Sequence, residues 1–297
     1  MANFCVLLKS RGLIKVEGED RAKFLQGLIS NDIDLVMPDR AIWAALLTPQ
    51  GKYLHDFFIL QRDDALYLDC EAERLMDLGQ RLRKYILRAD VSLDVVKDSA
   101  VVAMFGDSVG QALGLPKEVG AAGAWGGGVV YVDPRLASAG ARAVLPSDNV
   151  LQAVESAGFV MSDRDAYDRM RLSYGLSDGS RDLIVEKSIL LESNFDELHG
   201  VDWQKGCYMG QELTARTKYR GLVKKRLLPI RIEGPVPSPG APVLDGGRNV
   251  GEVRSAIDGM GLALIRLDAM EKVEGVASFN AGEAVVTPWT PGWARPS

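Results

Sequence analysis

Residues 205–221 read KGCYMGQELTARTKYRG, and this stretch places Cys207 just ahead of a run of positive charge. Gly206 and Gly210 flank the cysteine and allow close backbone approach or a positive φ. From Gly210 onward the sequence can form about two helical turns, so Cys207 would lie just before a helix N-terminus. Free backbone N–H groups, the helix dipole and nearby Lys205 would favour its thiolate form there. The pattern predicts a nucleophile or a metal ligand; the alternative is a tight loop in which a small cysteine is simply packed.

The charge of this segment contrasts with that of the whole chain. Across residues 205–226 a single acidic residue, Glu212, faces seven positive ones, whereas the chain of 297 residues carries a net charge of −5. The seven are Lys205, Arg216, Lys218, Arg220, Lys224, Lys225 and Arg226. The segment is either a localised anion-attracting feature or a solvated helix face followed by a strand end. The acidic total argues against wholesale nucleic-acid binding.

The other cysteines and the histidines offer little chemistry. Cys5, Cys70 and Cys207 are odd in number, widely spaced and without a C-x-x-C pair, which argues against a disulfide framework and a self-contained metal site. Cys5 and Cys70 lie in apolar strand-like runs and are interpreted as small buried side chains. His55 lies in an alternating strand pattern and is interpreted as structural. One thiolate cannot hold an iron–sulfur cluster alone, so further ligands would come from a partner or a small molecule.

Length and composition predict a globular protein of about two domains, on a prior of roughly 100–200 residues each. No segment approaches the ~18 consecutive apolar residues of a membrane helix, so no membrane association is expected. The first residues, MANFCVLLKSRGLIKVEGED, lack the basic start of a secretory signal and the arginines of a transit peptide. The predicted compartment is the cytoplasm in a bacterium, or an organelle matrix if the source is eukaryotic.

Short strands and helices alternate over the first 160 residues. Two strands flank Arg11, a helix follows Asp20, and residues 41–70 predict a three-stranded meander. Residues 71–87 repeat apolar side chains at helical spacing, and a smaller cycle of the same kind follows. This order predicts an α+β architecture of antiparallel strands with helices on one side. The glycines of GAWGGG are interpreted as a hairpin loop, because they do not follow the dinucleotide-binding pattern.

The sequence pattern changes twice further along the chain. Residues 176–209 read as irregular but ordered, with one short helical candidate near residues 195–198. From Lys225 onward, short strands alternate with Gly, Pro and Asn turns, which is typical of a small β-barrel or sandwich. A domain boundary is therefore predicted near residues 221–225.

The motif K-G-C-Y-x-G-Q-E, present at residues 205–212, resembles the hallmark of the YgfZ family of folate-binding proteins, which are related to the glycine-cleavage T-protein, an aminomethyltransferase. The blocks GLIKVEGEDRAKFLQGLISND, LTPQGKYLHDFFI and NVGEVRSA…GLALIRL resemble the family in the same order, so the resemblance covers nearly the whole chain. RDLIVEKSILLESN and ELTART are most similar to the mitochondrial branch, which matures [4Fe–4S] proteins.

The resemblance implies a fold and a division into domains. Residues 1–222 would form two intertwined α+β lobes, ferredoxin-like or T-protein-like, that bind tetrahydrofolate near a central channel. One lobe would comprise about residues 1–95 with 160–222, and the other residues 96–159. Residues 223–297 would form a C-terminal antiparallel β-barrel.

The resemblance also implies a site. Cys207 would be the reactive residue, a thiolate that ligates an iron–sulfur cluster shared with an A-type carrier protein. The implied folate-binding residues are Lys205, Tyr208, Gln211, Glu212, Arg216, Arg171 and Asn194. Tyr208 would stack on the pterin or its aminobenzoyl ring, Glu212 would accept hydrogen bonds from amino groups, and the basic segment would suit the anionic glutamate tail of folate.

One position departs from the transferase pattern. Aminomethyltransferases carry a pterin-binding Glu in an R-L-E-A-G run, whereas the run RLSYG at residues 171–175 has Ser173 there. A serine cannot make the paired charged contact of a carboxylate, which weighs against aminomethyl transfer.

Three functions remain open at this point. The first is a folate-linked accessory factor in [4Fe–4S] cluster assembly or repair. The second is a tetrahydrofolate-dependent one-carbon transferase or demethylase, although no catalytic constellation is evident. The third is a module that binds RNA or an acidic protein through the basic run.

Overall fold

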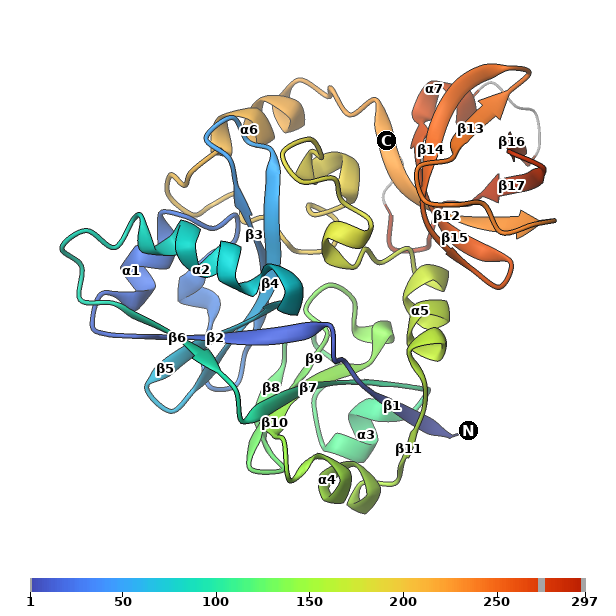
Figure 1. Ribbon diagram of the computed structural model, residues 1–297. Coiled ribbons are helices and arrows are strands. Elements are labelled where there is room, and N and C mark those ends of the chain that lie inside the picture. Colours follow the sequence, from blue (N-terminus) through green and yellow to red (C-terminus); the bar gives the residue numbers. More distant parts are fainter. Residues whose placement is uncertain (1, 272–275, 295–297) are drawn as a thin grey trace. The chain divides into compact units, whose positions relative to one another are not determined.

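The computed structural model describes residues 2–271 and 276–294. These residues form two α+β lobes, each with one β-sheet, and a β-barrel (Figure 1). The chain divides into two compact units. Unit 1 comprises Met1–Leu47, Leu54–Tyr167 and Leu198–Met209, and unit 2 comprises Thr48–Tyr53, Asp168–Glu197 and Gly210–Ser297. The domain boundaries predicted from the sequence stay a prediction.

A five-stranded sheet has the strand order β3-β4-β5-β2-β6. Its strands are β2 (Arg11–Glu17), β3 (Ile42–Leu47), β4 (Tyr53–Arg62), β5 (Ala65–Glu71) and β6 (Ser92–Val96). Strands β3, β4 and β5 are the predicted meander, and Asp63 turns between the last two with a φ of 53°. Their side chains are buried along almost their full length, because both faces of the sheet are covered.

Helices α1 (Arg21–Gln26) and α2 (Leu75–Arg83) belong to the same lobe, with 3₁₀ turns η1 (Ile33–Leu35) and η2 (Ala72–Arg74). Leu75, Leu78 and Leu82 of α2 are buried, at the spacing that places them on one helix face. Asp20 precedes α1 as predicted, but its carboxylate accepts the Asp90 N–H at 2.9 Å instead of an N–H of the helix.

A six-stranded sheet has the order β11-β1-β7-β10-β9-β8. Its strands are β1 (Asn3–Leu7), β7 (Ser99–Phe105), β8 (Ala122–Trp125), β9 (Gly128–Val132), β10 (Ala141–Pro146) and β11 (Phe159–Met161), accompanied by α3 (Val109–Leu113), η3 (Ala137–Ala139) and α4 (Val150–Ser156). Strand β1 pairs with β11 in parallel and with β7 antiparallel, so the N-terminal strand completes the second lobe and the two lobes are intertwined, as predicted. Gly126 and Gly127 form the β8–β9 hairpin loop with φ of 58° and 74°.

The C-terminal strands close into a barrel of order β12-β15-β14-β13-β16-β17, which confirms the predicted barrel. The strands are β12 (Lys225–Glu233), β13 (Pro242–Asp245), β14 (Arg248–Ile257), β15 (Met260–Arg266), β16 (Phe279–Ala281) and β17 (Ala284–Pro288), with α7 (Leu267–Met270) after β15. Inward side chains such as Ile230, Val253 and Ile265 are fully buried and form the barrel core.

The segment between α5 (Arg164–Ser173) and α6 (Gln211–Tyr219) is irregular, as the sequence predicts. It contains the 3₁₀ turns η4 (Gly179–Arg181) and η5 (Leu190–Ser193). The short helix expected near residues 195–198 is a series of turns. Asn194 and His199 bracket it with φ of 63° and 59°, and these left-handed residues interrupt a right-handed helix. No helix of the described residues is long and apolar enough to span a membrane.

A buried ionic cluster joins the two sheets of unit 1. The Asp69 carboxylate on β5 is fully buried and accepts from Arg11 Nε at 2.6 Å and from Arg142 Nη2 at 2.7 Å. Tyr131 donates its hydroxyl to the same carboxylate at 3.3 Å, and the Arg142 guanidinium lies 4.1 Å from the Phe58 ring centroid. Burial alone would raise the pKa of Asp69, but the two guanidiniums lower it below its ordinary value.

A second buried cluster lies in unit 2 and is centred on Arg171 of α5. Its guanidinium donates to Asp168 Oδ1 at 2.5 Å, to Asp182 Oδ2 at 2.8 Å and to Ser255 Oγ at 3.1 Å. Ser255 lies on barrel strand β14 and donates in turn to Asp182. Arg171 therefore ties α5, the irregular segment and the barrel together.

Candidate functional site

Cys207 is exposed, while Cys5 and Cys70 are buried. Burial raises the pKa of the Cys5 thiol to about 11 and that of the Cys70 thiol to about 12, so both stay protonated at neutral pH. These two cysteines have the structural role that their apolar surroundings predict. Cys207 is the cysteine whose sulfur faces solvent.

The segment before Cys207 is fixed to the loop that follows α1. Asn31 Nδ2 donates to the carbonyls of Trp43 and His199, both at 2.8 Å. Ser30 Oγ donates to the Gly200 carbonyl at 2.6 Å, and the Ser30 carbonyl accepts the Asp202 N–H at 3.1 Å. These bonds satisfy backbone groups that burial would otherwise leave unpaired, so they hold the segment in one position.

Lys205 fixes the same segment from inside. Its amino group is buried and donates to the carbonyls of Ile29 and Asn31, both at 2.7 Å. The ammonium also lies 5.1 Å from the Tyr208 ring centroid, within cation–π range. Lys205 and Tyr208 therefore contact each other on either side of Cys207 in the sequence, and Tyr208 is itself buried. Both side chains are buried, and their roles in folate binding stay predictions.

Met209 anchors the segment after Cys207. Its N–H donates to the Gly27 carbonyl at 3.0 Å, and its sulfur accepts the Tyr85 hydroxyl at 3.1 Å. With Lys205 fixed on one side and Met209 on the other, only Gly206 and Cys207 are exposed between them. The backbone thus presents the Cys207 thiol to solvent from a rigid support.

We expect the Lys205 contact to give the folding free energy a specific pH dependence. Burial lowers the pKa of Lys205 from 10.5 to about 8, although Asp32 and Asp202 oppose the shift. Between these values the unfolded chain binds more protons than the folded one, so stability rises with pH from about 8 to 10.5. Urea unfolding of the wild type and Lys205→Met over pH 7–10.5 should show the wild type gaining on the variant in this window; a constant difference would contradict it.

Gln211, Glu212 and Arg216 lie on α6 in unit 2. Gln211 is half-buried, whereas Glu212 and Arg216 are exposed and pair with each other one helical turn apart. Gly210 precedes the helix with a φ of 81°, a conformation that glycine adopts at little cost. Within unit 2 the α6 start packs on the Pro49–Gly51 turn, where a Cβ on Gly51 would lie 2.7 Å from the Gly210 carbonyl oxygen.

Arg171 and Asn194 are both buried and engaged within the protein. Arg171 forms the ionic cluster described above, and Asn194 Nδ2 donates to the Leu227 carbonyl at 2.7 Å. Asn194 Oδ1 is buried and has no hydrogen-bond partner among the described residues. Ser173, the departure from the transferase pattern, is exposed and donates its hydroxyl to the Met170 carbonyl at 2.7 Å.

The basic run is less available than its sequence implies. Lys218 pairs with Asp196, and Arg226 pairs with Glu197 at 2.6 Å. With the buried Lys205 and the Glu212–Arg216 pair, these contacts engage four of the seven basic side chains, and Arg220, Lys224 and Lys225 are exposed. The charge was visible in the sequence, but its partners lie 22 and 29 residues away from the basic side chains.

Sequence reasoning found Cys207 and missed the residues that hold it. Ser30, Asn31 and Gly27 lie in the block GLISND and contact the segment from about 170 to 180 residues away in the chain. No group of three His, Cys, Asp or Glu side chains in the described ranges could hold a metal ion. Cys207 offers a single sulfur ligand.

The comparisons with known proteins agree on fold and family. The barrel residues 224–296 match the family model described as the CAF17 C-terminal beta-barrel domain. The structure is similar to the glycine cleavage system aminomethyltransferase T of Bartonella henselae, with a TM-score of 0.77 and 16% identity over 97% of this chain and 84% of that chain. At that identity the likeness establishes the T-protein-like fold and nothing further.

Sequence relatives identify the family more closely. The mitochondrial iron–sulfur cluster assembly factor IBA57 of Homo sapiens is 34% identical over 94% of this chain and 81% of its own length, and that of Mus musculus is 31% identical over 97% and 85%. The homologue of Mycosarcoma maydis is 34% identical over 74% of this chain. The matched region covers 55% of that protein, so this chain spans about half of its length. These relatives therefore place the chain in the IBA57 branch rather than among the YgfZ proteins. This chain belongs to the family of the iron–sulfur cluster assembly factor IBA57.

Proposed function

We propose that this protein is an accessory factor in [4Fe–4S] cluster assembly, with Cys207 as a thiolate ligand of a cluster shared with an A-type carrier protein. The observation that carries the proposal is the presentation of Cys207: an exposed sulfur on a backbone fixed by Lys205 and Met209. A cluster needs about four thiolate-type ligands, so one sulfur from this chain leaves the others to the carrier. The names of the relatives support the same process.

Tetrahydrofolate is the second part of the proposal, and it rests on the T-protein-like fold. Glu212 and Arg216 are exposed on α6 and could meet the amino groups and the glutamate carboxylates of a folate. Asn194 Oδ1 is a buried acceptor without a partner in the described residues, which a polar ligand would satisfy. Arg171 and Lys205 are left out, because their donors are already engaged. A bound folate would supply one-carbon chemistry, and Ser173 lacks the carboxylate that the transferases use.

The replacement Cys207→Ser should abolish support of [4Fe–4S] enzymes in a deletion strain while leaving the fold intact, because the side chain is exposed. The purified variant, mixed anaerobically with the A-type carrier and reconstituted, should lack the visible spectrum of the wild-type complex. Gly206→Ala is a matched control, since its added methyl group meets nothing within 4 Å and the thiol remains. Full rescue of the strain by Cys207→Ser would refute the proposal.

Tetrahydrofolate binding can be measured on the same samples by calorimetry. Wild type and Cys207→Ser should bind it equally, because the sulfur makes no folate contact in this proposal. A wild type that binds no tetrahydrofolate would remove the folate part and leave the cysteine part standing.

A further inference from the structure

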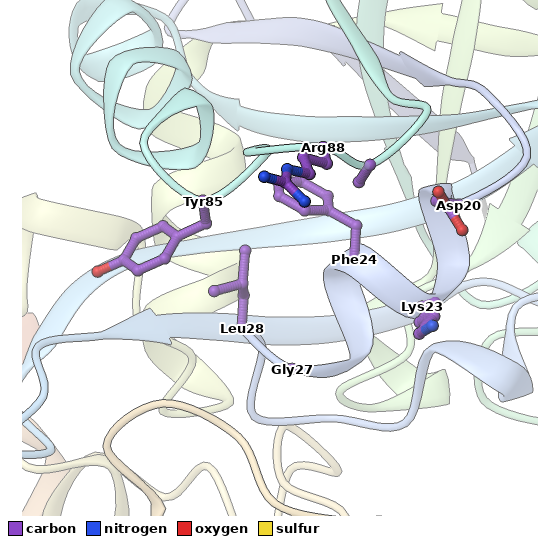
Figure 2. A pocket seen from close by; sticks show the side chains of 8 residues that line it. Asp20, Lys23, Phe24, Gly27, Leu28, Tyr85 and Arg88 are labelled. Atoms are coloured by element: carbon purple, nitrogen blue, oxygen red, sulfur yellow. The ribbon is translucent and has the colours of Figure 1, made fainter.

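A groove of about 480 Å³ lies in unit 1 beside the Cys207 segment. It is lined chiefly by Lys23, Phe24, Gly27, Leu28, Tyr85 and Arg88 and is called the α1 groove below. Figure 2 shows Phe24 and Leu28 rising from the α1 side toward the turn that carries Tyr85 and Arg88. No role assigned so far uses this groove.

The α1 groove has an apolar floor and a positively charged rim. Phe24 and Leu28 are 9% and 7% exposed, and Tyr85 is 42% exposed. Lys23 and Arg88 are exposed and form no ion pair among the described residues. Asp20, the acid at the groove, has its carboxylate bonded to the Asp90 N–H. A groove of this kind suits an apolar side chain next to carboxylates.

The α1 groove is continuous with the segment that presents Cys207. Gly27 and Tyr85 line the groove, and both contact Met209, at 3.0 Å and 3.1 Å. Met209 is two residues from Cys207, so their Cα atoms are at most about 7 Å apart. A stable interface covers about 800 Å² on each partner, which corresponds to a disc of roughly 16 Å radius. An interface of this size centred on Cys207 therefore reaches the groove.

We propose that the α1 groove is the docking site of the carrier protein that meets Cys207, and that it receives an apolar side chain flanked by carboxylates. This inference rests on the proposed function and adds the surface and the chemistry of recognition. The exposed Tyr85, Lys23 and Arg88 leave the groove open on one side. A small-molecule pocket usually encloses 70–90% of its ligand, whereas an anchor side chain needs only such an open groove.

Gly27→Phe tests the apolar part. Gly27 has a φ of −79° and a ψ of −7°, and a Cβ added there meets nothing within 4 Å, so the variant folds while its ring fills the groove. Binding of the full-length protein to the cluster-loaded A-type carrier from the same genome, measured anaerobically by biolayer interferometry, should weaken by about 30-fold or more, as for loss of an interface hot spot. Gly292→Phe is the matched control, an equally open glycine in unit 2, and should bind within about twofold of wild type.

Charge reversal tests the rim. The double variant Lys23→Glu/Arg88→Glu should bind the carrier about tenfold more weakly at low salt, and raising the salt should no longer weaken its binding. Lys97→Glu/Lys117→Glu changes the net charge equally at two exposed lysines outside the groove and should bind as the wild type does. Equal losses in both double variants would show that only net charge matters, and would overturn a specific rim.

The outcomes separate this inference from the proposed function. Cys207→Ser should still dock on the carrier but lose the cluster spectrum, whereas Gly27→Phe should fail to dock. If Gly27→Phe binds the carrier as tightly as the wild type does, the groove is not the docking site, and the cysteine proposal still stands. A wild-type spectrum from Cys207→Ser would overturn the cysteine proposal alone. Loss of tetrahydrofolate binding in Gly27→Phe with intact carrier docking would assign the groove to a small ligand instead, and a wild type that does not bind the carrier would refute both.

Discussion

Replacing Asp69 with alanine is expected to lower the free energy of unfolding by about 3–5 kcal/mol, the cost of leaving buried charges without their partner. Asp69 is fully buried, and its loss strands the guanidiniums of Arg11 and Arg142 between the two sheets of unit 1. Guanidine hydrochloride unfolding of purified Asp69→Ala measures the loss. Because the pKa of Asp69 is lowered in the folded state, its contribution is present above the ordinary pKa near 3.8 and is lost as the pH falls below it.

Two further variants sharpen the Asp69 prediction. Asp94→Ala changes an exposed aspartate on β6 of the same sheet and should stay within about 0.5 kcal/mol of the wild type. The triple variant Arg11→Met/Asp69→Leu/Arg142→Met replaces the whole cluster with apolar side chains and should recover much of the lost stability. A loss under about 1 kcal/mol in Asp69→Ala would mean that the cluster is solvated.

Arg171→Met is expected to lower the free energy of unfolding by a similar amount, about 3–5 kcal/mol, because it breaks the buried cluster of unit 2. The change removes the donors to Asp182 and Ser255, so α5 loses its Arg171 contacts with the irregular segment and with barrel strand β14, and the Ser255–Asp182 bond is left to join those two alone. Hydrogen exchange should rise at residues 176–183 and around Ser255, alongside the fall in unfolding free energy. Exchange unchanged at both places would show that other contacts hold the barrel.

Arg169→Met is the matched control for Arg171, two residues away on the same helix. Arg169 is 41% exposed in its side chain and pairs with an exposed Asp258, at 2.6 Å, so its loss should cost no more than about 1 kcal/mol. The pair of variants separates a buried ionic cluster from a surface ion pair on one helix.

These two clusters show where sequence reasoning stops. Strands, the meander, the hairpin at Gly126 and the barrel follow from local signals, namely alternation, turn residues and glycine, and the structure confirms them. Whether Arg171 faces a ligand or the interior depends on Asp182 and Ser255, which are 11 and 84 residues away. The motif placed Arg171 near a pterin, but no local pattern reveals that its donors are used inside the protein.

The same limit applies at the candidate site. The flanking glycines and the following charge predict a functional role for Cys207, and the structure places this residue at the surface. The sequence predicts that Lys205 attracts an anion, and in the structure its amino group donates to the carbonyls of Ile29 and Asn31 in the loop after α1. Such a role depends on a loop 174 residues away in the chain, which only the folded structure brings close.

The position of β1 has a consequence for synthesis of the chain. The strand is synthesised before its partners β7 and β11, which end at residues 105 and 161. At roughly 5–20 residues per second, β1 leaves the ribosome some 5–20 s before the first of these partners exists. During that interval an apolar strand has no sheet to join, so it is a natural substrate for holding chaperones. Codon changes that slow translation between residues 8 and 99 should therefore increase aggregation of nascent chains more than equal delays inside the barrel.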